Sequence, residues 1–392
     1  MTHFVEIIER SNASIVNKDR ETFWRLRYSL DEELMILLRS VEETWFGPFK
    51  GILFGQLQNT NYQNMCQNLE SFIMGETENE RLVCKSQPLL GVLVESLPSL
   101  KYIEFRVAMK MLFESCSDQL ISKCFDKYEE MFCEVYPMDN KESIFTTYSM
   151  SPVGLILEKS LDSFPFECLP TVQSYNQSFF RTPSLRILSL MYNTFKEGLF
   201  SKGVDQSKAY YVLNPSDNLP KTEEYFKNTF LSIKEWEGVI GKAPNPLELK
   251  EAFGSKEAYI FFGHGAGTSY YRSIPDGLDA CDVNCASLVI GCSSGRLFSE
   301  PQLDSHGTPF RFLMNGCPSY VGVLWDVTDK DIDKFSDQLL SYLFSKWKPE
   351  LNPSREMVAN TRAVAMSRRV CRLKYLIGAA PVVYGLPLFT KI

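Results

Sequence analysis

The spacing of apolar residues divides the chain into two regions. Up to about residue 145 the pattern is mainly helical, because residues 20–43 and 99–136 carry apolar positions at the three- and four-residue spacing of amphipathic helices. Between them, a short apolar run at residues 52–54, bracketed by glycines and a proline, predicts a buried strand. We therefore predict a helix-rich domain over residues 1–144.

From about residue 144, short apolar runs alternate with helical patterns. The candidate strands are residues 153–157, 209–213, 258–262, 286–290 and 320–325. The helical patterns cover residues 222–230, 246–253, 309–314 and 329–344. Such alternation is typical of a parallel sheet with helices on both faces. The sequence thus predicts an α/β domain with a mainly parallel sheet over residues 145–392.

Three of the predicted strands end on residues that can carry chemistry. A ligand site of a parallel sheet lies outside the carboxyl ends of its strands. The strand AYIFF is followed by GHGAG, which places His264 there, and the strand ASLVI is followed by GCSSG, which places Cys292 there. The third strand, YVGVLW, ends at Trp325 and is followed by DVTDKDID.

His264 and Cys292 form a candidate catalytic pair. The glycines on either side of His264 permit a tight turn. Cys292 is expected at the start of a helix, whose dipole would favour the thiolate. The histidine would act as general base and then as general acid, and the N–H groups of Gly265 and Cys292 could form an oxyanion hole.

The aspartates after Trp325 have two interpretations. Thr328 followed by Asp331 resembles a helix N-cap, where acidic residues are ordinary. The four aspartates of the segment exceed what a cap requires, and they are Asp326, Asp329, Asp331 and Asp333. Asp329 and Asp333 share a helix face, and a pocket walled by carboxylates would select an arginine of a substrate.

Composition narrows the chemistry further. Of the 392 residues 44% are apolar and 23% charged, as in ordinary globular proteins, and the net charge of −7 gives no reason to expect nucleic-acid or membrane binding. The eleven cysteines contain no CxxC pair, so we expect neither a disulfide framework nor a metal site. Only three histidines occur, which leaves His264 and His306 as internal candidates for a base. No signal-type segment opens the chain, which predicts an intracellular protein.

The order of His then Cys at successive strand ends resembles that in the caspase-like peptidase clan. The amino-acid sequences of the motifs resemble those of the separase family. The similar segments run from about residue 23 to the end, and they are LDEELMILLRSVEETWFGPFKGILFG, SFPFECLP, GHGAG, VIGCSSG, GCPSYVGVLWDVTDKDID and KYLIGAAPVVYG. The resemblance implies a caspase-like fold for residues 145–392. For residues 1–144 it implies a helix-rich pseudo-protease or substrate-binding domain.

The resemblance also implies roles for particular residues. His264 matches the catalytic histidine of the family and Cys292 its nucleophile, while the segment 326–333 matches the part that binds the arginine before the cut. Within this segment Asp333 is the favoured residue for binding the arginine, followed by Asp329 and then Asp326. Trp325 ends the strand beside the cleft, where an extended substrate could add main-chain hydrogen bonds. The family cleaves the kleisin subunit of cohesin to release sister chromatids, is inhibited by securin, and uses no cofactor or metal. Cytoplasm and nucleus are the implied locations, with spindle and chromosomes in mitosis.

Three points stay open at this stage. GCSSG also fits the nucleophile elbow of serine hydrolases, centred on Ser293, although the only later histidine, His306, is close in sequence. A non-catalytic module with the same fold is the other alternative. Separases usually carry a long helical-repeat region before this part, so the chain is expected to be either a compact separase or a truncated one, and the manner in which securin is held stays open.

Overall fold

The computed structural model describes residues 1–14, 19–136, 144–300, 302, 304–352 and 358–391. The chain forms two compact units. The sheet unit comprises residues 1–36, 154–168 and 178–392, and the helical unit comprises residues 37–153 and 169–177. Residues 1–36 therefore belong with the sheet, and the functional roles expected for residues 1–144 and 145–392 stay predictions.

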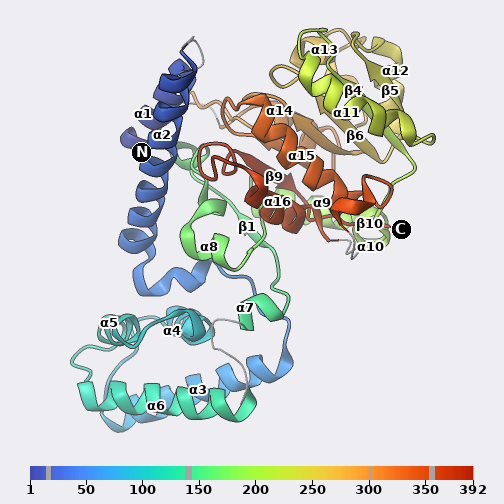
Figure 1. The fold of residues 1–392 in the computed structure, drawn as a ribbon. Coiled ribbons are helices and arrows are strands. Elements are labelled where there is room, and N and C mark those ends of the chain that lie inside the picture. Colours follow the sequence, from blue (N-terminus) through green and yellow to red (C-terminus); the bar gives the residue numbers. More distant parts are fainter. Residues whose placement is uncertain (15–18, 137–143, 301, 303, 353–357, 392) are drawn as a thin grey trace. The chain divides into compact units, whose positions relative to one another are not determined.

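One sheet dominates the sheet unit, with the strand order β1-β2-β9-β8-β7-β6-β4-β5 (Figure 1). From β2 to β5 all neighbours run parallel except β8 and β9. The strands are β1 (Val153–Leu155), β2 (Phe179–Arg181), β4 (Ala209–Leu213), β5 (Glu237–Ile240), β6 (Ala258–Phe262), β7 (Ala286–Ile290), β8 (Ser319–Val323) and β9 (Pro381–Gly385). The prediction of an α/β fold with a mainly parallel sheet is confirmed. A separate parallel pair joins β3 (Val204–Asp205) and β10 (Thr390–Lys391).

Helices accompany the sheet in the order that the sequence predicts. The helices of this unit begin with α1 (Thr2–Ser14) and most of α2 (Arg20–Val41), and continue with α9 (Leu185–Phe195), α10 (Leu199–Lys202), α11 (Pro220–Ser232), α12 (Pro246–Ser255), α13 (Thr268–Arg272), α14 (Thr308–Met314), α15 (Asp329–Leu343) and α16 (Asn360–Ser367). The four helical patterns predicted after residue 220 correspond to α11, α12, α14 and α15.

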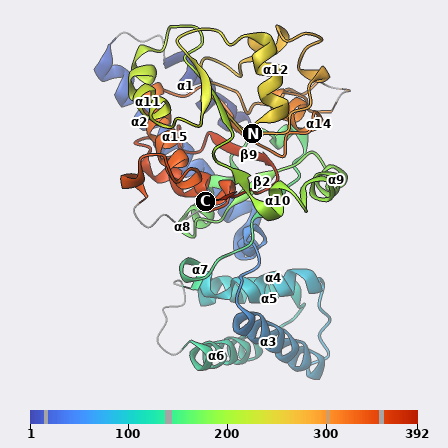
Figure 2. The same cartoon turned by 90° about the vertical axis from the view of Figure 1, so that its right-hand side faces the viewer.

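Both faces of the sheet are covered because β6 is apolar on both sides. The ring of Phe262 lies 4.6 Å from that of Phe226 on α11. Tyr259, three residues earlier and so on the opposite face, lies 5.0 Å from Phe253 on α12. Figure 2 shows α12 and α14 on one side of the sheet and α11 and α15 on the other. This arrangement leaves the carboxyl ends of the parallel strands to carry a site.

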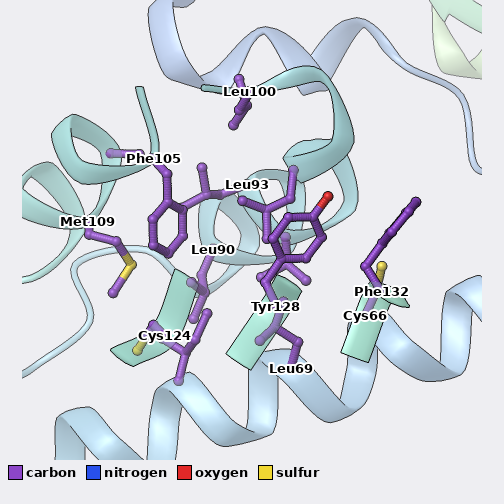
Figure 3. Close-up of a cluster of buried hydrophobic side chains, with 14 of the residues drawn as sticks. Cys66, Leu69, Leu90, Leu93, Leu100, Phe105, Met109, Cys124, Tyr128 and Phe132 are labelled. Atoms are coloured by element: carbon purple, nitrogen blue, oxygen red, sulfur yellow. The ribbon is translucent and has the colours of Figure 1, made fainter. Parts of the chain in front are cut away.

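The helical unit packs its helices around a core of its own. Its helices are α3 (Thr60–Asn79), α4 (Gln87–Ser96), α5 (Tyr102–Leu112), α6 (Asp118–Val135), α7 (Ile144–Thr147) and α8 (Pro170–Ser174). Leu69, Leu93, Phe105 and Tyr128 supply one buried side chain from each of α3 to α6 (Figure 3). None of the helices in the described residues has the length and apolar character needed to cross a membrane.

The prediction of a strand at residues 52–54 is wrong. Residues Gly47–Leu53 form a 3-10 helix instead. Gly47 has a positive φ of 49° and Pro48 opens the helix, which sets this tight conformation. Gly51 lies so close to α4 that an added Cβ would come 2.2 Å from Cβ of Ser96, so the apolar run packs on a helix rather than in a sheet.

Candidate active site

His264 and Cys292 lie at the carboxyl ends of adjacent parallel strands. The pairing of β6 with β7 ends at Phe262 opposite Ile290, so each candidate follows two residues after the last paired residue of its strand. The N–H of Gly263 donates to the carbonyl of Ile290 at 3.3 Å and extends this alignment by one step. This register brings the two side chains to one edge of the sheet.

Gly291 allows the main chain of the Cys292 loop to lie directly against the main chain of the His264 loop. A Cβ at this position would come 2.0 Å from the carbonyl oxygen of Gly265 and 2.5 Å from that of Gly263. No side chain fits between the loops, because real Cβ atoms do not approach carbonyl oxygens this closely. Gly265 itself adopts a φ of +61°, with open space where a Cβ would stand. The glycine before Cys292 is thus required by the close approach of the His264 loop.

Cys292 stands in a tight turn, and the helix predicted to start there is absent. Residues 292–295 form the turn, and Ser293 has a positive φ of 56°. Ser294 stabilises the turn, because its Oγ donates to the carbonyl of Val289 at 2.6 Å and accepts from the N–H of Val323 at 3.0 Å. The chain is thereby bound to the end of β8 and cannot continue as a helix.

The electrostatics at Cys292 also differ from the expectation. Burial raises the pKa of the Cys292 thiol, and the carboxylates of Asp326 and Asp329 act in the same direction. The thiol lies 3.6 Å from the carbonyl oxygen of Val327 and can donate to it. The helix dipole invoked to favour the thiolate is not available, so deprotonation depends on a neighbouring base.

One small pocket contains both candidates together with two of the aspartates. His264, Cys292, Asp329 and Asp333 all line it. The remaining lining residues are Leu219, Thr222, Phe262, Gly263, Ile290, Gly291, Val327 and Ile332. The side chains come from the ends of β6 and β7, from α11 and its approach, and from α15 with the loop before it. The pocket therefore joins a thiol, an imidazole and two carboxylates among apolar walls.

Asp333 is a buried carboxylate with a perturbed pKa. It is buried, and it accepts a hydrogen bond of 3.0 Å from the hydroxyl of Thr222 on α11. Burial raises the pKa of Asp333 to about 7, with Asp329 and Asp337 adding to the rise. Thr222 was missed by the sequence analysis, because only folding brings it beside a residue more than a hundred positions away.

Asp326 and Trp325 lie outside the pocket lining. Asp326 accepts a hydrogen bond of 2.7 Å from the hydroxyl of Ser293. Trp325 is buried, and its Nε1–H donates to the carbonyl of Leu376 at 2.8 Å. Thr328 occupies the N-cap of α15, but its side chain makes no capping bond. The substrate roles expected for Asp326 and Trp325 stay predictions.

Ser293 and His306 do not come together as a serine hydrolase would need. His306 pairs its main chain with Phe298 and lines a different pocket, beside Asp162 and Ser305. Among the described residues, no group of three or more His, Cys, Asp or Glu side chains is arranged to hold a metal ion.

Comparison with known proteins identifies the chain's relatives. The model of the family described as "Separin, protease domain" matches residues 1–332. The chain is 32% identical over 412 residues to a separin of Schizosaccharomyces pombe and 31% identical over 415 residues to one of Emericella nidulans. These alignments cover 99% and 97% of the chain but 22% and 19% of the relatives, so the chain spans about one fifth of their length.

The fold has a relative among solved structures as well. The whole chain matches 27% of a chain in the crystal structure of the Saccharomyces cerevisiae separase–securin complex at 3.0 Å resolution, with 26% identity and a TM-score of 0.77. The fold and the sequence together define a protease domain. The chain belongs to the separin family.

Proposed function

We propose that the chain is a separase-type cysteine endopeptidase, which cleaves the kleisin subunit of cohesin after an arginine and so releases sister chromatids at anaphase. The observation that carries this proposal is the shared pocket of His264, Cys292, Asp329 and Asp333. Membership of the separin family and the resemblance of the surrounding motifs support the choice of substrate.

In the proposed reaction Cys292 is the nucleophile and His264 the base. Because burial raises the pKa of the thiol, Cys292 keeps its proton until His264 accepts it as Sγ attacks the carbonyl carbon of the arginine. The N–H groups of Gly265 and Cys292 would donate hydrogen bonds to the negative oxygen of the tetrahedral intermediate. Each donor typically stabilises the transition state by about 3 kcal/mol. His264 then gives its proton to the leaving amine as the C–N bond breaks. Water, deprotonated by His264, finally hydrolyses the thioester and releases Cys292.

The arginine of the substrate would be bound by Asp333, with Asp329 beside it. Both line the pocket that holds Cys292, so a guanidinium bound there would leave its carbonyl near the thiol. A positive charge in this pocket would also compensate the burial of Asp333, whose ionised form is disfavoured without a partner. The side chain of Trp325 and the carboxylate of Asp326 would then act at a distance from the arginine.

The proposed partners follow from the family. Securin is present in the related yeast complex and is proposed to inhibit this chain as a pseudosubstrate. Residues 1–144 would contribute to substrate binding. The protein would act without cofactor or metal in the cytoplasm and nucleus, at the spindle and chromosomes in mitosis.

The test is cleavage of a recombinant kleisin fragment by the wild-type chain and its variants. Cys292→Ala and His264→Ala should abolish cleavage, and Asp333→Ala should lose the preference for arginine. An arginine-directed acyloxymethylketone peptide should label Cys292 in the wild type alone. A folded, securin-free wild-type chain that neither cleaves the fragment nor takes up the label would refute the proposal and favour a non-catalytic binding module.

A further inference from the structure

The segment that follows β8 holds the turn of Cys292 at three points. The N–H of Ser293 donates to the carbonyl of Trp325 at 3.4 Å, and its hydroxyl donates to Asp326 at 2.7 Å. The thiol of Cys292 lies 3.6 Å from the carbonyl oxygen of Val327. The position of the nucleophile is therefore tied to the position of the segment 325–327.

The side chain of Trp325 anchors that segment on its other side. The indole is buried, and its N–H donates to the carbonyl of Leu376 at 2.8 Å. Phe4 of α1 packs edge to face on the indole, with ring centroids 5.8 Å apart. The main chain of residue 324 is bound to a residue near Leu376, because its N–H donates to the carbonyl of Ala380 at 2.9 Å. The stretch 376–380 is thus the support on which the segment rests.

Asp31 of α2 fixes this support. Its Oδ1 accepts hydrogen bonds from the N–H of Tyr375 at 2.9 Å and from the N–H of Leu376 at 2.7 Å. Residue 376 therefore has its N–H bound by Asp31 and its carbonyl bound by Trp325. A chain of hydrogen bonds leads from α2 through residue 376 and the indole to the turn of Cys292.

A buried arginine, one turn before Asp31 on α2, ties this helix to α1. The guanidinium of Arg27, one turn earlier, is fully buried and donates to the hydroxyls of Ser11 and Ser14 at 3.2 and 3.4 Å. The charges of Asp31 and Asp331 both act on it. Asp331, on α15, accepts from the N–H of Leu373 at 3.2 Å and so pins the start of the same support.

We infer that Asp31 is a positioning residue for Cys292, acting through Leu376 and Trp325. The inference rests on the proposed function, because it takes Cys292 as the nucleophile. Asp31 is too far along this chain of bonds to touch a substrate in the pocket, whose lining does not include it. Its loss should therefore lower kcat and leave KM nearly unchanged, since a displaced nucleophile affects the reaction rather than the binding of the arginine.

The test compares Asp31→Ala with Asp31→Asn, using an arginine peptide substrate and the acyloxymethylketone label. Both N–H donors reach the same oxygen, so an asparagine carbonyl can accept both bonds. Asp31→Ala should lower kcat and the labelling rate about tenfold or more, with KM within about twofold, and Asp31→Asn should restore kcat to within about threefold of wild type. Glu32→Ala, at an exposed position of the same helix, is the matched control.

Trp325→Phe provides a second variant that keeps the ring packing on Phe4 but removes the indole N–H. It should lower kcat about fivefold. The double variant with Asp31→Ala should be no slower than the slower single variant, because both substitutions break the same chain of hydrogen bonds.

Three outcomes would overturn the inference: wild-type kcat in Trp325→Phe, a change in KM alone, or effects on kcat that multiply in the double variant. Should Asp31→Ala fail to fold, Trp325→Phe alone still decides the route through residue 376, because wild-type kcat in that variant overturns the inference. A wild-type chain without cleavage or labelling would instead refute the proposed function.

Discussion

His264 and Cys292 occupy equivalent places on two adjacent parallel strands, each two residues past the last paired residues Phe262 and Ile290. Parallel pairing keeps successive residues of neighbouring strands level with each other, so two residues at the same distance past the last pair come to the same edge of the sheet, where both line one pocket. The proposed dyad is therefore a product of register, and changes that disturb the alignment of the two loops should disturb catalysis first.

Gly291→Ala should disturb that alignment directly. The new Cβ would stand 2.0 Å from the carbonyl oxygen of Gly265, so one of the two loops must move. A displacement of about 1 Å at the reacting groups costs about 100-fold in rate, and we expect a loss of kcat/KM of at least this size in a peptide cleavage assay. The free energy of unfolding should fall by about 1–3 kcal/mol.

Gly254→Ala is the matched control for this substitution. Gly254 lies in α12, and its added Cβ would come no closer than 3.8 Å to its nearest neighbour. An alanine there should leave cleavage unchanged and add about 0.5–1 kcal/mol of stability, because glycine is a poor helix former. Retention of full activity by Gly291→Ala would show that the two loops are not held by this contact.

The strands and the pair at their ends were predictable because both depend on local sequence. The runs AYIFF and ASLVI are apolar throughout, as buried parallel strands are, and the position after such a strand is fixed by the chain itself. His264 and Cys292 needed no knowledge of distant residues. The same holds for α15, which begins at Asp329 and carries Asp333 one turn later.

What the sequence could not provide are contacts between distant segments. The bond from Thr222 to Asp333 joins α11 to α15, and the bonds from Asp31 reach residues near the other end of the chain. A helix was predicted at Cys292 from its place after a strand, although the Ser294–Gly295 pair of GCSSGRL is a local signal for a turn. Only the bonds of Ser294 to β7 and β8 show why the chain turns there.

Asp333→Asn should change the dependence of stability on pH. Burial raises the pKa of Asp333 to about 7 in the folded chain, above the value of about 3.9 for an unfolded chain. The wild type therefore loses stability as pH rises from about 4 to 7, because the unfolded chain releases its proton in this range while folded Asp333 keeps it. Asparagine does not titrate, so the variant should gain up to about 4 kcal/mol over wild type at pH 8 and almost nothing at pH 4, as measured by urea unfolding. Equal pH profiles for the two proteins would contradict the raised pKa.

Ser293→Gly should separate a cysteine nucleophile from a serine nucleophile. The positive φ of 56° at Ser293 suits glycine, so the turn should keep its shape while the hydroxyl that donates to Asp326 is lost. If Cys292 is the nucleophile, the variant should keep at least about a tenth of the wild-type kcat, the loss reflecting one hydrogen bond to a carboxylate. Cys292→Ala should be inactive in the same peptide assay. The opposite pattern would make Ser293 the nucleophile of a hydrolase elbow.

Binding of an arginine peptide should strengthen as pH rises through about 7. Only ionised Asp333 attracts a guanidinium strongly, and with a pKa of about 7 the carboxyl is mostly protonated at pH 6 and mostly ionised at pH 8. Affinity measured by titration calorimetry on the Cys292→Ala chain, which removes the reaction and the thiol, should be about tenfold weaker at pH 6 than at pH 8. His264→Ala in the same background should show the same dependence, which excludes the imidazole as its source, whereas Asp333→Asn should bind weakly at every pH. A dependence that persists in Asp333→Asn but disappears in His264→Ala would move the titrating group from the carboxylate to the imidazole.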